Sequence, residues 1–233
     1  MMAEDRLGGL LTRLAALAPD TARLEQICRG SVALLEVSGA AVILMSEEEP
    51  GALTASFGAR VAEIEDLQFA LGEGPCLEAF RNGSPVLEPE LGDGLADRWP
   101  EFGRHAVALD AKAVFVLPLQ LGAIRLGVLY LYRDRPGPLS AGQLADGLDL
   151  AELAMLAVLE LQSHALPGEL AVGLAGEWTH RAAVHQATGL VAAQLDAKLA
   201  DALACIRAFA FTQDRTIYSV AADIVSGALR LQR

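Results

Sequence analysis

The C-terminal stretch from Trp178 to Arg233 carries a hydrophobic pattern that three short amphipathic helices satisfy. Apolar residues recur there at helical spacing in three separate runs, with polar residues between them. The stripes consist of Val184, Ala187, Val191 and Leu195, then of Leu199, Leu203 and Ile206, and finally of Ile217, Val220, Ala221, Ile224, Val225 and Ala228. Each predicted helix therefore has one face to bury, and its cationic and hydrogen-bonding side chains lie away from that face.

Charge is distributed unevenly along the chain. Trp178 to Arg233 contains six Lys or Arg and four Asp, a net charge of +2, whereas the other residues carry a net charge of -14. Affinity for nucleic acid comes largely from neutralised phosphates, so the C-terminal stretch is the part suited to an anionic partner. Because one copy has few cations, we expect dimerisation to bring two copies of this surface together.

Length and composition limit the class of protein. A chain of 233 residues divides most naturally into two domains. No apolar run approaches the roughly 18 residues that a membrane-spanning helix needs, and Glu4 and Asp5 do not fit a secretory signal. The cysteines Cys28, Cys76 and Cys205 are odd in number and scattered, which suits a reduced compartment and gives no metal-ligand spacing. We therefore expect a cytoplasmic protein with no membrane partner and no metal site.

The first two thirds of the chain mix helical and strand patterns. Expected helices cover Leu7 to Leu17, about Thr21 to Val37, the turn after Gly72 up to Asn82, Trp99 to Ala108, and Ser140 to about His164. Expected strands are Ala41 to Met45, Leu53 to Phe57, Pro85 to Leu87, Ala113 to Leu117 and Ile124 to Tyr132. This order is typical of an α+β domain built on an antiparallel sheet flanked by helices.

Three segments of that domain have a distinctive wording, namely LGEGPCLEAF (Leu71 to Phe80), RWPEF (Arg98 to Phe102) and VFVLPLQLGAIRLGVLYLYRDRPGPLS (Val114 to Ser140). They resemble GAF sensor domains, within a likeness from about Arg23 to Leu161. The resemblance implies a small-ligand pocket, which Leu44, Phe57, Cys76, Phe80, Phe115 and Leu117 would line. The alternative is that these apolar residues are ordinary core. The residue set of cyclic-nucleotide GAF domains is missing, so the ligand and any cofactor stay unknown.

The segment HRAAVHQATGLVAAQLDAKLADALACIRAFAFTQDRTIYSVAADIV, from His180 to Val225, resembles the ANTAR family of RNA-binding antitermination modules. The resemblance implies an all-α three-helix bundle that recognises paired RNA hairpins. The residues expected to face RNA are Arg181, His185, Gln186, Thr188, Arg207, Arg215 and Tyr218. In this set Arg181 and Arg215 would contact phosphates, and Tyr218 would stack on an unpaired base. Polar contacts would come from Gln186 and Thr188.

The two resemblances predict one architecture. Residues 1–163 would form the sensor domain, 164–177 a linker with a helix start, and 178–233 the RNA-binding bundle, joined through a long helix. We expect these connecting helices to pair in a homodimer, so that a signal at the sensor changes the separation of two RNA-reading surfaces. The sequence thus predicts a signal-responsive transcription antitermination regulator.

Two alternatives stay open. Many ANTAR members have a lysine where this chain has Thr188, which permits a ligand-sensing or protein-interaction dimer that has lost RNA binding. A GAF-based redox enzyme would use Cys76, because a helix N-terminus after Gly74 would lower its thiol pKa; a structural buried cysteine is the simpler interpretation. Because nucleophile-elbow, phosphate-loop and paired-histidine motifs are missing, we expect no catalytic residue and no enzyme.

Overall fold

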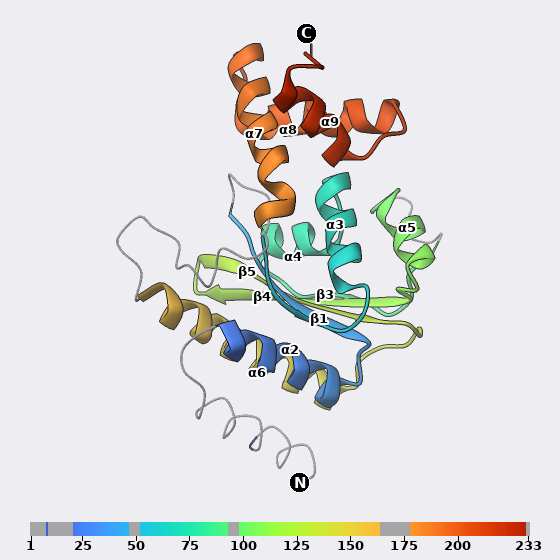
Figure 1. Cartoon of the computed structure of the whole chain (residues 1–233). Coiled ribbons are helices and arrows are strands. Elements are labelled where there is room, and N and C mark those ends of the chain that lie inside the picture. Colours follow the sequence, from blue (N-terminus) through green and yellow to red (C-terminus); the bar gives the residue numbers. More distant parts are fainter. Residues whose placement is uncertain (1–7, 9–20, 47–51, 93–97, 164–177, 232–233) are drawn as a thin grey trace.

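The structure, a computed structural model, describes residues 8, 21–46, 52–92, 98–163 and 178–231. The elements are α2 (Thr21–Leu35), β1 (Gly39–Leu44), β2 (Ala52–Phe57), α3 (Val61–Leu71), α4 (Pro75–Asn82), β3 (Val86–Glu88), α5 (Phe102–Ala108), β4 (Ala113–Leu121), β5 (Ile124–Arg133), α6 (Ala141–Ser163), α7 (Trp178–Leu195), α8 (Leu199–Thr212) and α9 (Ile217–Ser226). In Figure 1, α2 and α6 lie on one face of the sheet, α3 to α5 on the other, and α7 to α9 beyond α3.

The five strands form one sheet in the order β2-β1-β5-β4-β3, and all neighbours are antiparallel. The hairpin of β4 and β5 pairs Ala113 with Arg133 at one end and Leu121 with Ile124 at the other. The predicted α+β class with an antiparallel sheet is therefore confirmed. Strand β4 runs four residues beyond the predicted end at Leu117, because its pairing with β5 continues to the tight turn.

The sheet separates two hydrophobic cores. Successive side chains of a strand point to opposite faces, so Phe115 and Leu117 of β4 pack with α2 and α6, whereas Val114 and Val116 pack with α4 and α5. A third core lies inside the bundle of α7, α8 and α9. These three helices fall where the hydrophobic periodicity places them, and most of each predicted stripe enters that core. The exceptions are Leu199, which is exposed at the start of α8, and Ala228, which lies exposed beyond the end of α9 at Ser226.

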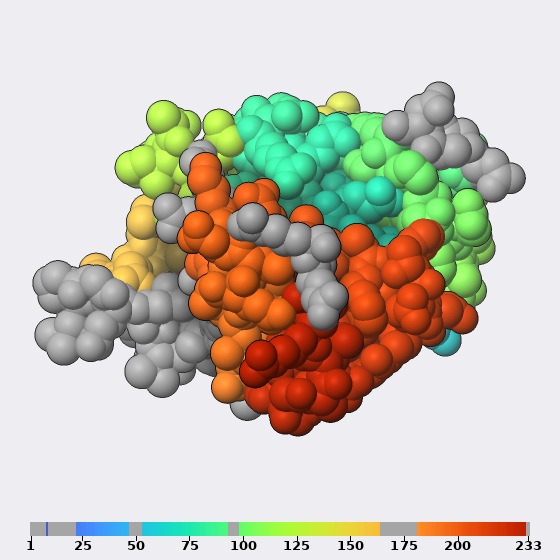
Figure 2. Space-filling view, turned by 90° about the horizontal axis from the view of Figure 1, so that it is seen from above, coloured from blue at the N-terminus to red at the C-terminus, as the bar shows by residue number. Residues whose placement is uncertain are grey.

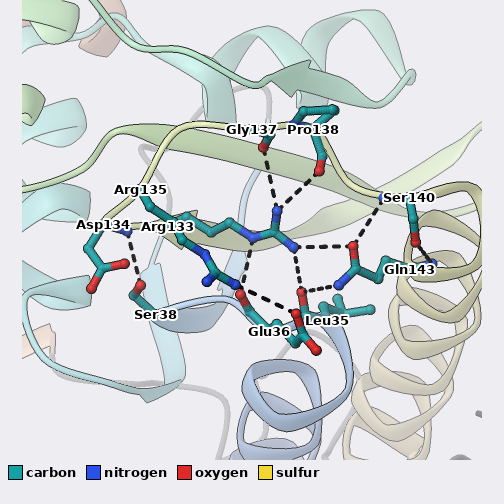
Figure 3. A network of polar contacts seen from close by, with 10 residues as sticks. All are labelled: Leu35, Glu36, Ser38, Arg133, Asp134, Arg135, Gly137, Pro138, Ser140 and Gln143. Carbon is teal, nitrogen blue, oxygen red and sulfur yellow. Dashed lines mark hydrogen bonds and ion pairs between the residues drawn. The ribbon is translucent and has the colours of Figure 1, made fainter.

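A buried arginine fastens the first helix layer to the sheet. Figure 3 shows the Arg133 guanidinium donating to the carbonyls of Leu35 and Glu36 at the C-terminal end of α2, and to the side chain of Gln143 in α6. Gln143 and Ser140 form a reciprocal cap at the start of α6, which confirms the predicted helix start at Ser140. Burial lowers the pKa of Arg133, and the helix C-terminal carbonyls offset the cost of burying its charge.

Helix α3 was not expected from the sequence. Its buried positions are Val61, Ile64, Glu65, Gln68 and Phe69. Polar residues occupy two of these five positions, so the apolar stripe that identifies an amphipathic helix is interrupted.

Two predicted segments cannot be compared with the structure. Apart from Gly8, the expected helix over Leu7 to Leu17 lies outside the described residues, as does the predicted linker 164–177. Within the described ranges, no helix combines the length and apolar character that crossing a membrane requires.

Candidate functional site

The candidate site lies where α3 of the sheet-containing unit meets the helical bundle. Helix α3 presents Glu65, Asp66 and Phe69 to α7, α8 and α9, and Phe69 is buried as a member of the bundle's own core. Viewed from the bundle's side in Figure 2, the orange and red helices lie directly against teal and green segments of the first unit. The contact joins residues more than a hundred positions apart in the sequence.

Arg181 of α7 makes the central contact. Its Nη2 donates to both α3 carboxylates, to Glu65 Oε2 and, at 2.9 Å, to Asp66 Oδ1. Its guanidinium carbon lies 4.0 Å from the centroid of the Phe69 ring, within the range of a cation–π interaction. The side chains of Arg181 and Glu65 are only 7% and 6% exposed. Arg181 is therefore enclosed by α3 rather than presented to solvent.

Burial opposes ionisation of this pair, and pairing favours it. Desolvation raises the pKa of the Glu65 carboxyl to about 7, although the adjacent Arg181 acts in the opposite direction. Desolvation alone would lower the pKa of Arg181, but the two carboxylates outweigh it and raise the pKa, so the guanidinium stays charged. The arrangement places a fixed positive charge against two acceptors at the surface of α3.

Arg207 of α8 binds the end of α3 instead of a carboxylate. Its Nε and Nη2 donate to the carbonyl oxygen of Phe69 at 3.0 and 2.6 Å. That carbonyl belongs to the last turn of α3, where the helix dipole is negative. Among the described residues Arg207 forms no ion pair, and burial together with Arg181 and Arg81 lowers its pKa to about 10. Arg207 thus caps α3 from the bundle side.

Tyr218 of α9 completes the contact. Its hydroxyl donates to Asp66 Oδ1 at 2.8 Å, the same oxygen that accepts from Arg181. Its ring stacks on Phe69, with centroids 6.4 Å apart and planes inclined by 18°. Burial and the bond to Asp66 raise the pKa of Tyr218 far above its ordinary value, so the hydroxyl remains a donor. The His185 ring lies 6.5 Å from the same phenyl ring.

The structure divides the residues expected to face RNA into two groups. Arg181, His185, Arg207 and Tyr218 surround Phe69 of α3, as described above. The other three, all in the described part of the chain, form no hydrogen bond or ring contact with Phe69, although Arg215 lines a groove that also borders α3. Gln186 is exposed, Arg215 is exposed and pairs with Asp223 at 2.7 Å, and Thr188 is buried with its hydroxyl donating to the Val184 carbonyl at 2.7 Å. In this conformation the Thr188 hydroxyl therefore hydrogen-bonds within its own helix and does not face a partner.

The residues expected to line one ligand pocket are separated by the sheet, so that prediction is wrong as a single site. Phe115 and Leu117, with Leu44 and Phe57 beside them, belong to the core under α2 and α6. Cys76 and Phe80 of α4 belong to the core on the opposite face. The physical reason is the two-residue alternation of β4, which places its odd-numbered side chains in this range away from α4.

Cys76 is held by α3 rather than presented to a substrate. Its amide donates to Gln68 Oε1 at 2.9 Å, and Gln68 Nε2 donates to its sulfur at 3.2 Å. Burial raises the pKa of the thiol well above its ordinary value, which outweighs any lowering by the N-terminus of α4. The predicted dipole effect on this thiol is therefore overridden.

Three cavities adjoin the contact, and Arg207 lines all of them. The first, of about 20 Å³, lies among Glu65, Gln68, Phe69 and Cys76 and has room for about one water molecule. Two open grooves of about 360 and 560 Å³ lie between the bundle and helices α3 and α5, and both are lined by Ala70, Leu71, Arg207 and Phe211. Solvent therefore borders the contact at its Arg207 end.

Comparison with known proteins identifies the first unit. Residues 21–159 match the family model described as GAF domain. The structure is similar to the GAF domains of phosphoenolpyruvate-protein phosphotransferases from Acinetobacter (13% identity, TM-score 0.56, 70% of this chain and 96% of that chain) and Coxiella burnetii (15%, 0.55, 69% and 95%). It is also similar to free methionine-R-sulfoxide reductase from Neisseria meningitidis (16%, 0.52, 66% and 87%). Identities this low indicate a shared fold. No curated protein matches the chain.

Proposed function

The chain belongs to the GAF domain family, and from this premise we propose that it is a signal-responsive transcription antitermination regulator. A GAF domain is a small-molecule signal-sensing module. In the proposed function this domain controls RNA binding by an ANTAR-like bundle of α7, α8 and α9. The protein would act in the cytoplasm as a homodimer, on paired RNA hairpins, without catalysing a reaction.

The observation that carries the proposal is the clustering of four sequence-predicted residues on one surface of the bundle. Arg181 and Arg207 supply guanidinium groups, Tyr218 an aromatic ring and His185 an imidazole, all around the position of Phe69. Proteins recognise unpaired RNA bases by stacking them on aromatic or guanidinium planes, and they hold phosphates with arginine. The surface therefore offers the two kinds of contact that an RNA loop requires.

The distribution of charge favours RNA binding by the bundle and disfavours RNA binding by the GAF domain. The segment from Trp178 to Arg233 has a net charge of +2, against -14 for the rest of the chain. RNA would be repelled by the sensor domain and would approach from the bundle side. A dimer would double the number of cations, which fits the expectation that the RNA partner contains two hairpins.

An interaction dimer without RNA binding is the second candidate, and two observations favour it. Thr188 is buried where many ANTAR members have a lysine, and the Arg181 charge is already satisfied by Glu65 and Asp66. A redox enzyme is less well supported. Cys76 is buried and hydrogen-bonded to Gln68, so its sulfur has no access to a substrate in this conformation.

A filter-binding titration with substitutions of exposed arginines tests the RNA-binding proposal. The probe is a pool of paired RNA hairpins with randomised loops, titrated at several salt concentrations. Arg215→Gln removes one exposed cation of the bundle and should reduce the slope of log K against log salt by about 0.7 to 0.9 if Arg215 contacts a phosphate. The matched control Arg104→Gln removes an exposed cation of α5 and should leave the slope unchanged. Equal effects of the two substitutions would contradict the assigned surface.

A further inference from the structure

We propose that α3 is an internal competitor for RNA, in which Glu65 and Asp66 occupy phosphate positions and Phe69 occupies the position of a stacked base. This inference rests on the proposed function and names its regulation. The structure would then be the closed state of the regulator. Binding of RNA and binding of α3 would exclude each other, because both use the same side chains of the bundle.

The exclusion follows from burial. Arg181 donates to both carboxylates of α3, and Tyr218 donates to Asp66. Arg207 donates twice to the Phe69 carbonyl. Three bundle residues expected to contact RNA therefore have α3 partners, and a phosphate could reach Arg181 only after Glu65 had left. Of the RNA-facing set, Gln186 and Arg215 remain exposed in the closed state.

The chemistry of α3 matches that of the ligand it would replace. A carboxylate and a phosphate both accept charge-assisted hydrogen bonds from guanidinium groups. The Phe69 ring lies 4.0 Å from one guanidinium carbon and 5.6 Å from the other, and it stacks on Tyr218. Stacking tolerates any aromatic ring, because each presents a π face. Two adjacent acids and a phenylalanine one turn later thus present α3 as an anionic, aromatic ligand.

The contact is built to be reversible. Two open grooves of about 360 and 560 Å³ reach Arg207 and the C-terminal end of α3, so solvent borders the contact there. Asp66 is 45% exposed at its side chain, so water competes for its hydrogen bonds. A polyanionic RNA with several phosphates could outcompete the two carboxylates once the contact between α3 and the bundle is loosened.

The same helix connects the contact to the sensor. Gln68 holds both the amide and the sulfur of Cys76 at the start of α4, and it lines the small cavity together with Glu65 and Phe69. That cavity, of about 20 Å³, leaves no room for an organic molecule. A small molecule entering between the sheet and α3 would have to displace these side chains, and with them the residues that bind Arg181. Entry of the small molecule and release of α3 from the RNA-binding residues of the bundle would therefore occur in one movement.

The test neutralises the acids without changing their shape. In the full-length protein, Glu65→Gln with Asp66→Asn replaces both carboxyl groups of the contact with amides of the same shape. The matched control, Asp149→Asn with Glu152→Gln, removes two exposed charges from α6. Asp66→Ala alone provides a variant at a half-exposed site that does not disturb the buried core. Hydrogen exchange of α3 amides reports opening, and titration with the pool of paired RNA hairpins reports affinity.

The expected result is faster exchange in α3 together with RNA affinity raised roughly 5- to 100-fold in the two contact variants, a range typical of coupling between sites. The control should change neither quantity. Faster exchange with unchanged or weaker RNA binding would overturn the competition and leave the proposed function standing. Unchanged α3 exchange in both contact variants would also overturn it, because the acids would then not hold the contact. Absence of RNA binding by the wild type and by a variant shown to be open would refute the proposed function, and the competition with it.

Discussion

At the scale of single residues, burial divides the three thiols of the chain into two classes. Cys28 and Cys76 are buried, whereas Cys205 on α8 is exposed. Burial raises the pKa of Cys28 to about 12 and that of Cys76 further still. At pH 8 the buried Cys28 and Cys76 are therefore almost entirely in the thiol form, whereas the thiolate is the reactive form.

We therefore expect the native protein to react rapidly with one equivalent of a thiol reagent at pH 8. Cys205→Ser should abolish this fast phase, whereas Cys76→Ser should leave it unchanged. Unfolding in urea should expose all three thiols of the wild type. The measurement is absorbance of the released thiol product over time. Rapid labelling of Cys76 in the folded protein would instead support a redox role for that residue.

The identities of the site residues could be predicted better than their surroundings. Arg181, Arg207 and Tyr218 were predicted as site residues, and the structure brings these three together. Their partners Glu65 and Asp66 were not identified. Acidic residues are abundant in this chain, and nothing local in the sequence distinguishes a pair that binds an arginine more than a hundred residues away from one in solvent.

At the scale of elements, helix α9 depends on its cap. Thr216 Oγ1 accepts a hydrogen bond from the Ser219 amide at 3.2 Å, and the helix that follows is only ten residues long. Short helices owe much of their stability to such caps and to packing. Tyr218 follows two residues after the cap, so loss of the cap would also loosen the contact with α3.

Thr216→Ala should lower the free energy of unfolding of the bundle by about 1 kcal/mol, the usual cost of removing a capping hydroxyl. The measurement is urea denaturation followed by circular dichroism. Thr212→Ala serves as control, because Thr212 donates to the Phe209 carbonyl at the end of α8 and caps no helix N-terminus. Thr216→Ser should retain most of the stability. Equal losses for Thr212→Ala and Thr216→Ala would argue against the cap.

The elements themselves differ in how far the sequence predicts them. Strands β4 and β5 and the long helix α6 were predicted because continuous apolar runs and a Ser140 cap indicate them clearly. Helix α3 was missed because Glu65 and Gln68 occupy buried positions. Those two residues are polar because one binds the bundle and the other binds Cys76. The buried polar residues Glu65 and Gln68 thus hide the helix from sequence-based prediction, and the same residues connect α3 to the bundle and to α4.

At the scale of the whole molecule, the sensor domain and the bundle share Phe69. This residue of α3 is buried in the core of α7, α8 and α9. Burying a phenylalanine side chain contributes about 2 to 3 kcal/mol, and the adjacent guanidinium groups add to this. The relative position of the two units therefore depends strongly on one aromatic ring.

Phe69→Ala should destabilise the bundle by about 3 kcal/mol and separate its unfolding from that of the sensor domain, because the substitution leaves a cavity at the joint. Hydrogen exchange should show faster exchange in α7 to α9 and little change in β1, β4 and β5. Phe211→Ala is the matched control, since Phe211 is 67% exposed in the neighbouring helix. A uniform increase in exchange across the sheet would show that Phe69 serves the sensor core instead.

Helix α3 packs against the sheet of the GAF domain and also contributes Phe69 to the core of the bundle. This has a consequence for transplanting either unit to another protein. A bundle grafted behind a different GAF domain would carry its arginines and Tyr218 to the new host, but it would leave Glu65, Asp66 and Phe69 behind. Under the proposed competition, such a chimaera would bind RNA without a signal, because no internal competitor would cover Arg181 and Tyr218. Adapting the protein to a new signal would instead require keeping the segment of α3 from Glu65 to Phe69 and changing the residues of the GAF domain that surround it. That short segment would have to be transferred together with the bundle.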